Sequence, residues 1–207
     1  NSDGSHDTSF VLQETGFNGA VLQIIPLLNG KILVGGDFTY YNGVERRGIH
    51  RLQKNGYSDD TFFIGSGFGG SNGLVKTIAV QKDNKILVGG SFNFFNGSDY
   101  SKLIRLNVNG DFDSTFLAAL GLGAVSVRTI SIQTDNKILV GGRYTNIFER
   151  LNTNGNLDTS LNVGVNYWGG DGVQSGPFYL NDSKIQSDNK ILICGNFSSY
   201  RGSSSIN

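Results

Sequence analysis

One six-residue segment occurs four times in this chain at nearly constant spacing. Its first copy, at 31–36, reads Lys-Ile-Leu-Val-Gly-Gly, identical copies lie at 85–90 and 137–142, and the copy at 190–195 reads Lys-Ile-Leu-Ile-Cys-Gly. The opening lysines are 54, 52 and 53 residues apart. A fixed period near fifty residues indicates a modular array, in which one supersecondary unit repeats and neighbouring units bury a common core.

Each unit consists of short strand patterns separated by turn residues. In the second unit, Val75–Gln81 alternates apolar with small or polar residues, which predicts a strand with one buried face. Asp83-Asn84 follows, a pair suited to a two-residue hairpin with positive φ at both centres. The next segment, Lys85–Phe92, is almost wholly apolar and is typical of a strand buried on both faces. A third strand and a fourth short segment ending in Asp-x-Thr-Phe complete the unit, so we expect an all-β fold.

A four-stranded antiparallel unit of about 53 residues has the size of a propeller blade. We therefore predict a single β-propeller domain over 1–207, with units at approximately 11–62, 63–116, 117–161 and 162–207, the last completed by 1–10. Either four blades close into a ring, with a strand near Ser2–Phe10 paired in the sheet of Lys190–Phe197, or the chain is an arc of a larger propeller. An open β-solenoid is the alternative architecture.

Composition excludes some partners. The formal net charge is zero and only 16% of residues are charged, which argues against nucleic-acid binding and against a polybasic membrane patch. No apolar run approaches 18 residues, so we expect no direct membrane insertion. Cys194, the single cysteine, is expected to be a buried small apolar residue. The chain begins at Asn1 and contains no methionine, so we expect a processed product or part of a larger chain or assembly.

The combined motifs resemble a known repeat family. Asp-Asn-Lys-Ile-Leu-Val-Gly-Gly-x-Phe, then Ile-x-Arg-Leu-Asn-x-Asn-Gly, then Asp-x-Thr-Phe, is similar to the delta-60 repeat. That resemblance implies a β-propeller from a bacterial surface protein, such as an adhesin, or from a virion-surface protein such as a phage tail fibre. It also implies a non-enzymatic structural and recognition module that is extracellular, on a cell surface or on a virion. Its partner would be a protein or a cell-surface glycan.

Charged residues recur at two positions of the unit. An arginine of the third strand is followed eight residues later by an aspartate, which a hairpin could bring beside it. Such pairs could form a ring of charges around a channel or ligand, or a structural clamp that orders each blade, and we favour the clamp. The residues are Arg51, Arg105 and Arg150, with Asp59, Asp113 and Asp158, and Asp7 as the fourth aspartate.

Two sets of aromatic residues are candidates for binding. The fourth unit has an extended loop whose Tyr167, Trp168, Asp171 and Gln174 suit a sugar ring or a protein partner. Alternatively, Trp168 fills the gap left by the short third unit. Adjacent aromatic residues also recur in one loop of successive units; Tyr40 and Phe94 are expected to be exposed there, and Tyr41, Phe95 and Tyr200 to be buried. A lectin-like, carbohydrate-binding module is therefore the alternative function.

Catalytic and metal-binding patterns are missing from the sequence. The two histidines, His6 and His50, lie at different positions of the repeat, and no base is marked beside a nucleophile. Clustered Cys and His ligands, a calcium loop and a P-loop lysine are all lacking. We therefore expect no enzyme activity, no cofactor and no metal.

Overall fold

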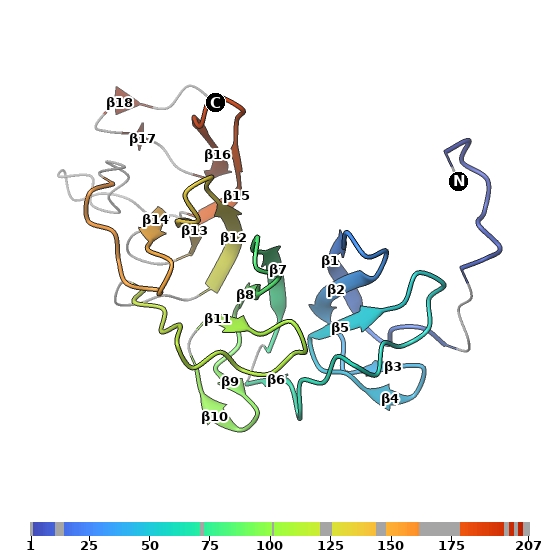
Figure 1. Ribbon diagram of the computed structural model, residues 1–207. Helices are drawn as coiled ribbons and strands as arrows, with labels where there is room; N and C mark the ends of the chain where they lie inside the picture. Colours follow the sequence, from blue (N-terminus) through green and yellow to red (C-terminus); the bar gives the residue numbers. More distant parts are fainter. Residues whose placement is uncertain are drawn as a thin grey trace.

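The computed structural model describes residues 2–10, 15–70, 73–100, 102–120, 126–143, 148–161, 179–196, 199–200 and 203–204. Every regular element in these ranges is a β-strand, which confirms the all-β prediction. The longer strands form four successive antiparallel sheets, here named blades 1 to 4 (Figure 1). Blade 1 contains β1 (Ala20–Pro26), β2 (Ile32–Asp37) and β5 (Ile49–Leu52); blade 2 contains β7 (Val75–Val80), β8 (Ile86–Gly90) and β11 (Leu103–Leu106); blade 3 contains β12 (Ser126–Ile132), β13 (Ile138–Arg143) and β14 (Phe148–Leu151); blade 4 contains β15 (Tyr179–Ile185) and β16 (Ile191–Asn196).

Short two-residue strands lie in the loops that follow the second strand of blades 1, 2 and 4, and one further such strand precedes the first strand of blade 2. They are β3 (Tyr40–Tyr41) with β4 (Val44–Glu45), β6 (Phe68–Gly69) with β9 (Phe94–Phe95) and β10 (Ser98–Asp99), and β17 (Ser199–Tyr200) with β18 (Ser203–Ser204). The expected fourth strand of each blade is reduced to a single bridge. These bridges are Leu52↔Ser58, Leu106↔Phe112 and Leu151↔Leu157. Blades 1 to 3 are therefore three-stranded sheets, each with a fourth segment attached at one point.

The turn between the first two strands of a blade differs from the predicted two-residue hairpin. In blade 2 the amide of Gln81 bonds the carbonyl of Lys85, and Asn84 N–H bonds Gln81 C=O, so three residues form the loop. Only Asn84 has positive φ, at 65°, and Asp83 instead accepts the amide of Lys85 on its side chain. Asn136, Asn189 and Gly30 adopt positive φ at the same place in the other blades. The residue pair predicted a hairpin correctly, but the loop is one residue longer.

The blades are arranged in an arc. β1, β7, β12 and β15 lie on its concave side, and β5, β11 and β14 lie further out (Figure 1). Each blade has a leading face toward the preceding blade and a trailing face toward the next one. Ile78 and Val75 of the leading face of blade 2 pack on the trailing face of blade 1 at Leu33. The core therefore lies between blades, as expected for a propeller.

The first glycine of the repeated segment lets the next blade pack closely against this strand. A β-carbon built on Gly35 would lie 2.5 Å from Ile78 Cδ1, and one built on Gly89 would lie 2.5 Å from Val127 Cγ1. Polar contacts also stabilise the interface between blades 1 and 2. The Gln23 side chain accepts a hydrogen bond from the N–H of Ile78 and donates one to its C=O. The central apolar residues of the repeated segment are fully buried in blades 1 to 3, as predicted.

The prediction for Cys194 is wrong, because this residue is exposed. Cys194 pairs with Asp182 in the register in which Gly35 pairs with Gln23, so it stands at the first glycine position of the repeat. Its side chain therefore projects from the trailing face of blade 4. Leu192, beside it on this face, is also exposed, whereas its equivalents Leu33, Leu87 and Leu139 are buried.

Ring closure by the N-terminal residues does not occur in this structure. Residues 2–10 form no strand, and β16 pairs with β15 alone among the described strands. The N-terminal segment lies at the opposite end of the arc from blade 4 (Figure 1). The fold is thus an open arc of propeller blades.

Candidate functional site

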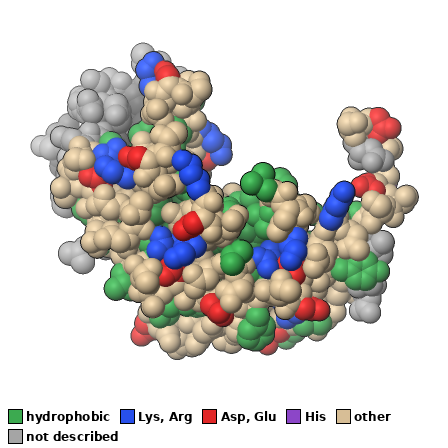
Figure 2. Space-filling model, in the orientation of Figure 1, with side chains coloured by type: hydrophobic (Ala, Val, Ile, Leu, Met, Phe, Trp, Pro, Cys, Tyr) green, Lys and Arg blue, Asp and Glu red, His purple; other side chains and the backbone are tan. Residues whose placement is uncertain are grey.

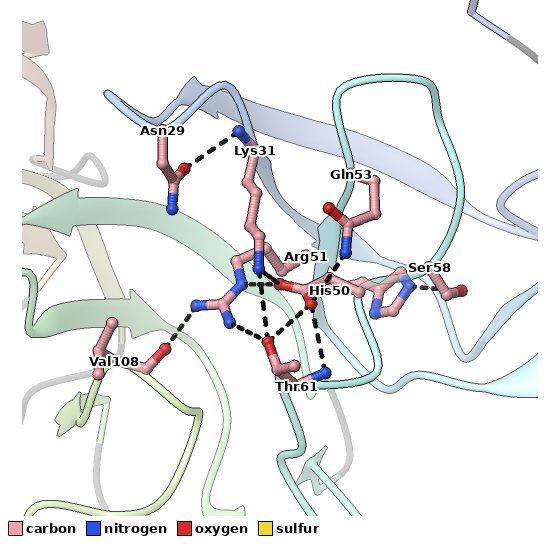
Figure 3. Close-up of polar contacts among 9 residues, drawn as sticks. Asn29, Lys31, His50, Arg51, Gln53, Ser58, Thr61 and Val108 are labelled. Carbon is pink, nitrogen blue, oxygen red and sulfur yellow. Dashed lines mark hydrogen bonds and ion pairs between the residues drawn. The ribbon is translucent and has the colours of Figure 1, made fainter.

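The recurrent charges of blade 1 meet in one buried cluster (Figure 3). Asp59 Oδ2 accepts hydrogen bonds from Arg51 Nε at 2.5 Å and from Lys31 Nζ at 2.8 Å. Its second oxygen accepts the Thr61 hydroxyl at 2.7 Å. Lys31 directly precedes β2, Arg51 lies on β5, and the Asp59 amide bonds the Arg51 carbonyl, so the third strand and the following turn bring the charges together.

The same cluster occurs in the next two blades. Asp113 accepts Lys85 at 2.8 Å and Arg105 at 2.7 Å, and Asp158 accepts Lys137 and Arg150 at the same two distances. Thr115 and Ser160 take the place of Thr61. The predicted Arg–Asp pairs therefore exist in three units. Basic and acidic side chains also lie next to each other at several places on the surface shown in Figure 2.

The arginine also reaches the following blade. Arg51 Nη1 donates to the carbonyl of Val108 at 2.5 Å, and Arg105 Nη1 donates to the carbonyl of Thr153 at 2.7 Å. Each guanidinium also lies over a phenylalanine ring, with Arg51 4.7 Å from the centroid of Phe62. The clusters of blades 1 and 2 thus each link the end of one unit to a turn of the next.

The clusters keep their carboxylates ionised. Burial raises the pKa of Asp113, but hydrogen bonds from Lys85, Thr115 and Arg105 outweigh burial and hold the pKa well below its ordinary value. The pKa of Asp59 is lowered by the same balance of effects. A carboxylate bound in this way is a poor general base, because its lone pairs are already occupied and its proton affinity is low.

Asp7 does not form the fourth cluster. Its carboxylate accepts the amide and the hydroxyl of Ser9, and no arginine pairs with it among the residues described. The hydrogen bonds from Ser9 lower the pKa of this exposed carboxyl. Sequence reasoning also missed the lysine and the Thr or Ser of each cluster, although the lysine opens every copy of the repeated segment and was therefore detectable.

The rim aromatics divide as the sequence predicts. Tyr41 and Phe95 are 1% exposed, whereas Tyr40 and Phe94, at the equivalent positions before them, are each 40% exposed. The Tyr41 hydroxyl donates to the carbonyl of Gly56 at 2.6 Å, which fixes the loop to the turn below it. The outer aromatics therefore recur on one rim of successive blades. Tyr167, Trp168, Asp171 and Gln174 lie outside the described residues, as does the side chain of Tyr200.

The described residues contain neither a cluster of metal ligands nor a membrane-spanning helix. Among the described residues, no group of three or more His, Cys, Asp or Glu side chains is arranged to hold a metal ion. In the same part of the chain, no helix has the length and hydropathy needed to cross a membrane.

Comparison with protein families identifies the repeat. The family model described as "Domain of unknown function (DUF5122) beta-propeller" matches residues 28–62, 81–116, 133–161 and 186–207, which together make up more than half of the chain. The chain belongs to this family. Its DUF5122 repeats coincide with the four copies of the Lys-Ile-Leu segment, so the fold is a β-propeller rather than a solenoid. No curated protein sequence matched the chain.

A solved structure agrees with the DUF5122 assignment of the fold. The WD40 β-propeller domain of Doa1 superposes with a TM-score of 0.55 at 17% identity, over 86% of this chain and 48% of that one. The extracellular domain of BT4673 from B. thetaiotaomicron matches with a TM-score of 0.45 at 16% identity, over 82% of this chain and 19% of that one. The DUF5122 chain thus spans less than half the length of either structure.

Proposed function

We propose that this chain is a non-enzymatic structural and recognition module of an extracellular, cell-surface or virion protein. The more specific delta-60 resemblance supports a setting such as a tail fibre or an adhesin. The observation that carries the proposal is the pair of exposed aromatics, Tyr40 and Phe94, at equivalent rim positions of successive blades. Aromatic side chains that keep a large exposed area at little conformational cost are common anchors of binding surfaces.

The buried charges support a structural role for the rest of the repeat. Each described cluster satisfies its aspartate with a lysine, an arginine and a hydroxyl, and nothing in this arrangement requires a substrate. A module of this kind presents its partner-specific residues on loops while the repeated strands hold the scaffold. The proposed partner is a protein or a cell-surface glycan.

The rim is tested by replacing both exposed aromatics. A Tyr40→Ser, Phe94→Ser double variant is expected to keep the melting temperature of the parent and to lose binding to a glycan array or to bacterial surface preparations. Tyr57→Ser is the matched control, because Tyr57 is 39% exposed but lies in a turn outside these loops. Equal binding by the double variant and the control would contradict the proposed rim.

A lectin-like module is the second candidate. It is favoured by the polar setting of Tyr40, whose amide and that of Thr39 both donate to the Asn18 side chain at the rim. Stacking of a sugar on an aromatic ring with nearby amides would use such a surface. A glycan array with Trp168→Ala as a further variant separates the two candidates. Selective loss of glycan signals would indicate a lectin. Loss of binding to a protein partner with unchanged glycan signals would indicate a protein-recognition module.

A further inference from the structure

The inner strands on the concave side of the arc, β1, β7, β12 and β15, each contain a β-bulge. Each inner strand has a register shift near its start, and the extra residue there does not pair with the second strand. β-Bulges redirect side chains and are frequent beside functional sites. The four bulge residues are Leu22, Lys76, Arg128 and Asn181.

Two of these residues and one neighbour form a group of positive charges. Lys76 and Arg128 occupy the bulges of blades 2 and 3, whose inner strands are in contact. Arg143 ends β13 and pairs with Ser126, next to the bulge of β12. Burial and then the nearby charges of Arg128 and Arg143 lower the pKa of Lys76, so all three cations share one region.

No described carboxylate forms an ion pair with any of the three. This differs from the Lys–Arg–Asp clusters, where each of the described cations bonds an aspartate. Like charges placed together at a partly buried site oppose folding unless something compensates them.

The repeat shows that the fold does not need these cations. Blade 1 has Leu22 and Asp37 at the positions of Arg128 and Arg143, and blade 4 has Asn181 and Asn196 there. Those blades form the same bulge and the same strand pairing. The charges of blades 2 and 3 are therefore additions to a blade that folds without them.

Arg128 is held in place and still has an unused donor. Its guanidinium lies 4.3 Å from the centroid of the Tyr179 ring, and Nη1 donates to Asn181 Oδ1 at 2.9 Å. Its Nε is buried and has no hydrogen-bond partner among the described groups. A buried donor without an acceptor is unfavourable, so an acceptor placed beside this guanidinium would stabilise the arrangement.

We propose that Lys76, Arg128 and Arg143 form a binding site for an oxyanion, such as a carboxylate, sulfate or phosphate group, on the concave side of the arc. An oxyanion offers several acceptors to the guanidinium and ammonium donors and compensates their mutual repulsion. This site goes beyond the proposed rim surface and does not depend on it, because none of its residues belongs to the rim loops.

The test measures stabilisation by anions. The melting temperature of the full chain is recorded in phosphate, sulfate and acetate, each against sodium chloride of equal ionic strength. Sulfate and phosphate at high concentration stabilise proteins in general, so the anions are titrated over the low millimolar range. We expect at least one oxyanion to raise the melting temperature there with a saturable dose dependence that chloride lacks, and the three arms tell which class of oxyanion is preferred. Equal effects of all salts would overturn the proposal.

Variants locate the effect. Lys76→Gln and Arg143→Gln are each expected to weaken oxyanion binding about tenfold, the effect of losing one charge-assisted contact. Without oxyanion, Lys76→Gln should be at least as stable as the parent, since repulsion is relieved. Lys54→Gln, which removes an exposed lysine of a blade 1 turn, is the matched control. Equal weakening by Lys54→Gln would show general charge screening and overturn the site.

Discussion

At the scale of single residues, the aspartate of each charged cluster is predicted to matter more for stability than for binding. Asp113→Ala would leave Arg105 and Lys85 without their shared counter-charge in a largely buried setting. Breaking a buried ion pair from one side is strongly destabilising, so we expect a loss of about 3 kcal/mol in the free energy of unfolding. Urea denaturation measures this loss.

Two further variants test whether the loss at Asp113 comes from the buried cluster. Asp99→Ala removes an exposed carboxylate of β10 and should change stability by less than about 0.5 kcal/mol. Arg105→Ala should likewise destabilise the fold rather than abolish binding. Loss of binding by an Arg105 variant with an unchanged melting temperature would contradict the structural role of the cluster.

His50 gives the fold a separate dependence on pH. It is 1% exposed, its Nε2 lies 3.1 Å from the Ser58 hydroxyl, and burial, followed by the charge of Arg46, lowers its pKa to about 4. Between the ordinary pKa of about 6.5 and 4, the unfolded chain binds a proton that the folded chain does not. Stability should therefore fall as pH drops through this window, by about 3 kcal/mol in total.

The measurement is an NMR titration of the His50 ring together with unfolding at pH 7 and pH 4. Carboxylates also begin to titrate near pH 4, so the difference between the parent and His50→Gln isolates the histidine. A ring that titrates near 6.5 in the folded protein would be inconsistent with this account.

The charged clusters also show what a sequence reveals at this scale. The Arg–Asp pairs were predictable because both residues recur at a fixed spacing across a turn. Their contact with a carbonyl of the next blade was not predictable, because it depends on how two sheets stack. For Arg51 this carbonyl belongs to Val108, which is 57 residues away.

At the scale of elements, the two glycines of the repeated segment are predicted to have different tolerances. A β-carbon on Gly89 would meet the side chains of Val127 and Thr77, whereas one on Gly90 would lie 2.0 Å from the carbonyl oxygen of Leu74. Side chains can shift, but the backbone of the paired strand cannot move without breaking its register. Gly89→Ala should cost about 1–3 kcal/mol, and Gly90→Ala should cost more.

Gly69→Ala is the control for both substitutions. Gly69 lies in β6 without positive φ, and its nearest contact for an added β-carbon is 4.0 Å away. In chemical denaturation, the loss in free energy of unfolding should therefore be largest for Gly90→Ala, smaller for Gly89→Ala and smallest for Gly69→Ala. A Gly69 variant as unstable as the Gly90 variant would show that added side-chain volume is not the cause.

The strands themselves were largely predictable, and their departures have local causes. Alternation over Val75–Gln81 predicted the first strand of blade 2, and the apolar repeated segment predicted the second strand of every blade. The three-residue hairpin loop was missed because the side chain of Asp83 bonds a backbone amide, so that only Asn84 takes positive φ. Burial of Cys194 was wrongly predicted because it depends on whether a further blade covers the trailing face, and no described blade does.

At the scale of the whole molecule, the arc has two unlike ends. The trailing face of blade 4 carries Asp182, Lys184 and Cys194, whereas the leading face of blade 1 carries Val21 and Ile24. In blades 2 and 3 the residues equivalent to Val21 and Ile24 are buried against the blade before them. Sequence periodicity predicts the blades but not the exposure of Val21 and Ile24, since the buried equivalents in blades 2 and 3 are also valine and isoleucine.

The final prediction compares one residue type at two equivalent places. Ile24 pairs with Val34 as Ile78 pairs with Val88, yet Ile24 is 61% exposed and Ile78 is 1% exposed. Ile78→Ala leaves a cavity between blades and should cost about 2–5 kcal/mol, whereas Ile24→Ala should cost less than about 1 kcal/mol because the removed atoms already contact water. Urea unfolding of both variants at several protein concentrations measures the difference. Equal losses would mean that the leading face of blade 1 is covered in solution, and a concentration-dependent loss at Ile24 would identify another copy of the chain as its cover.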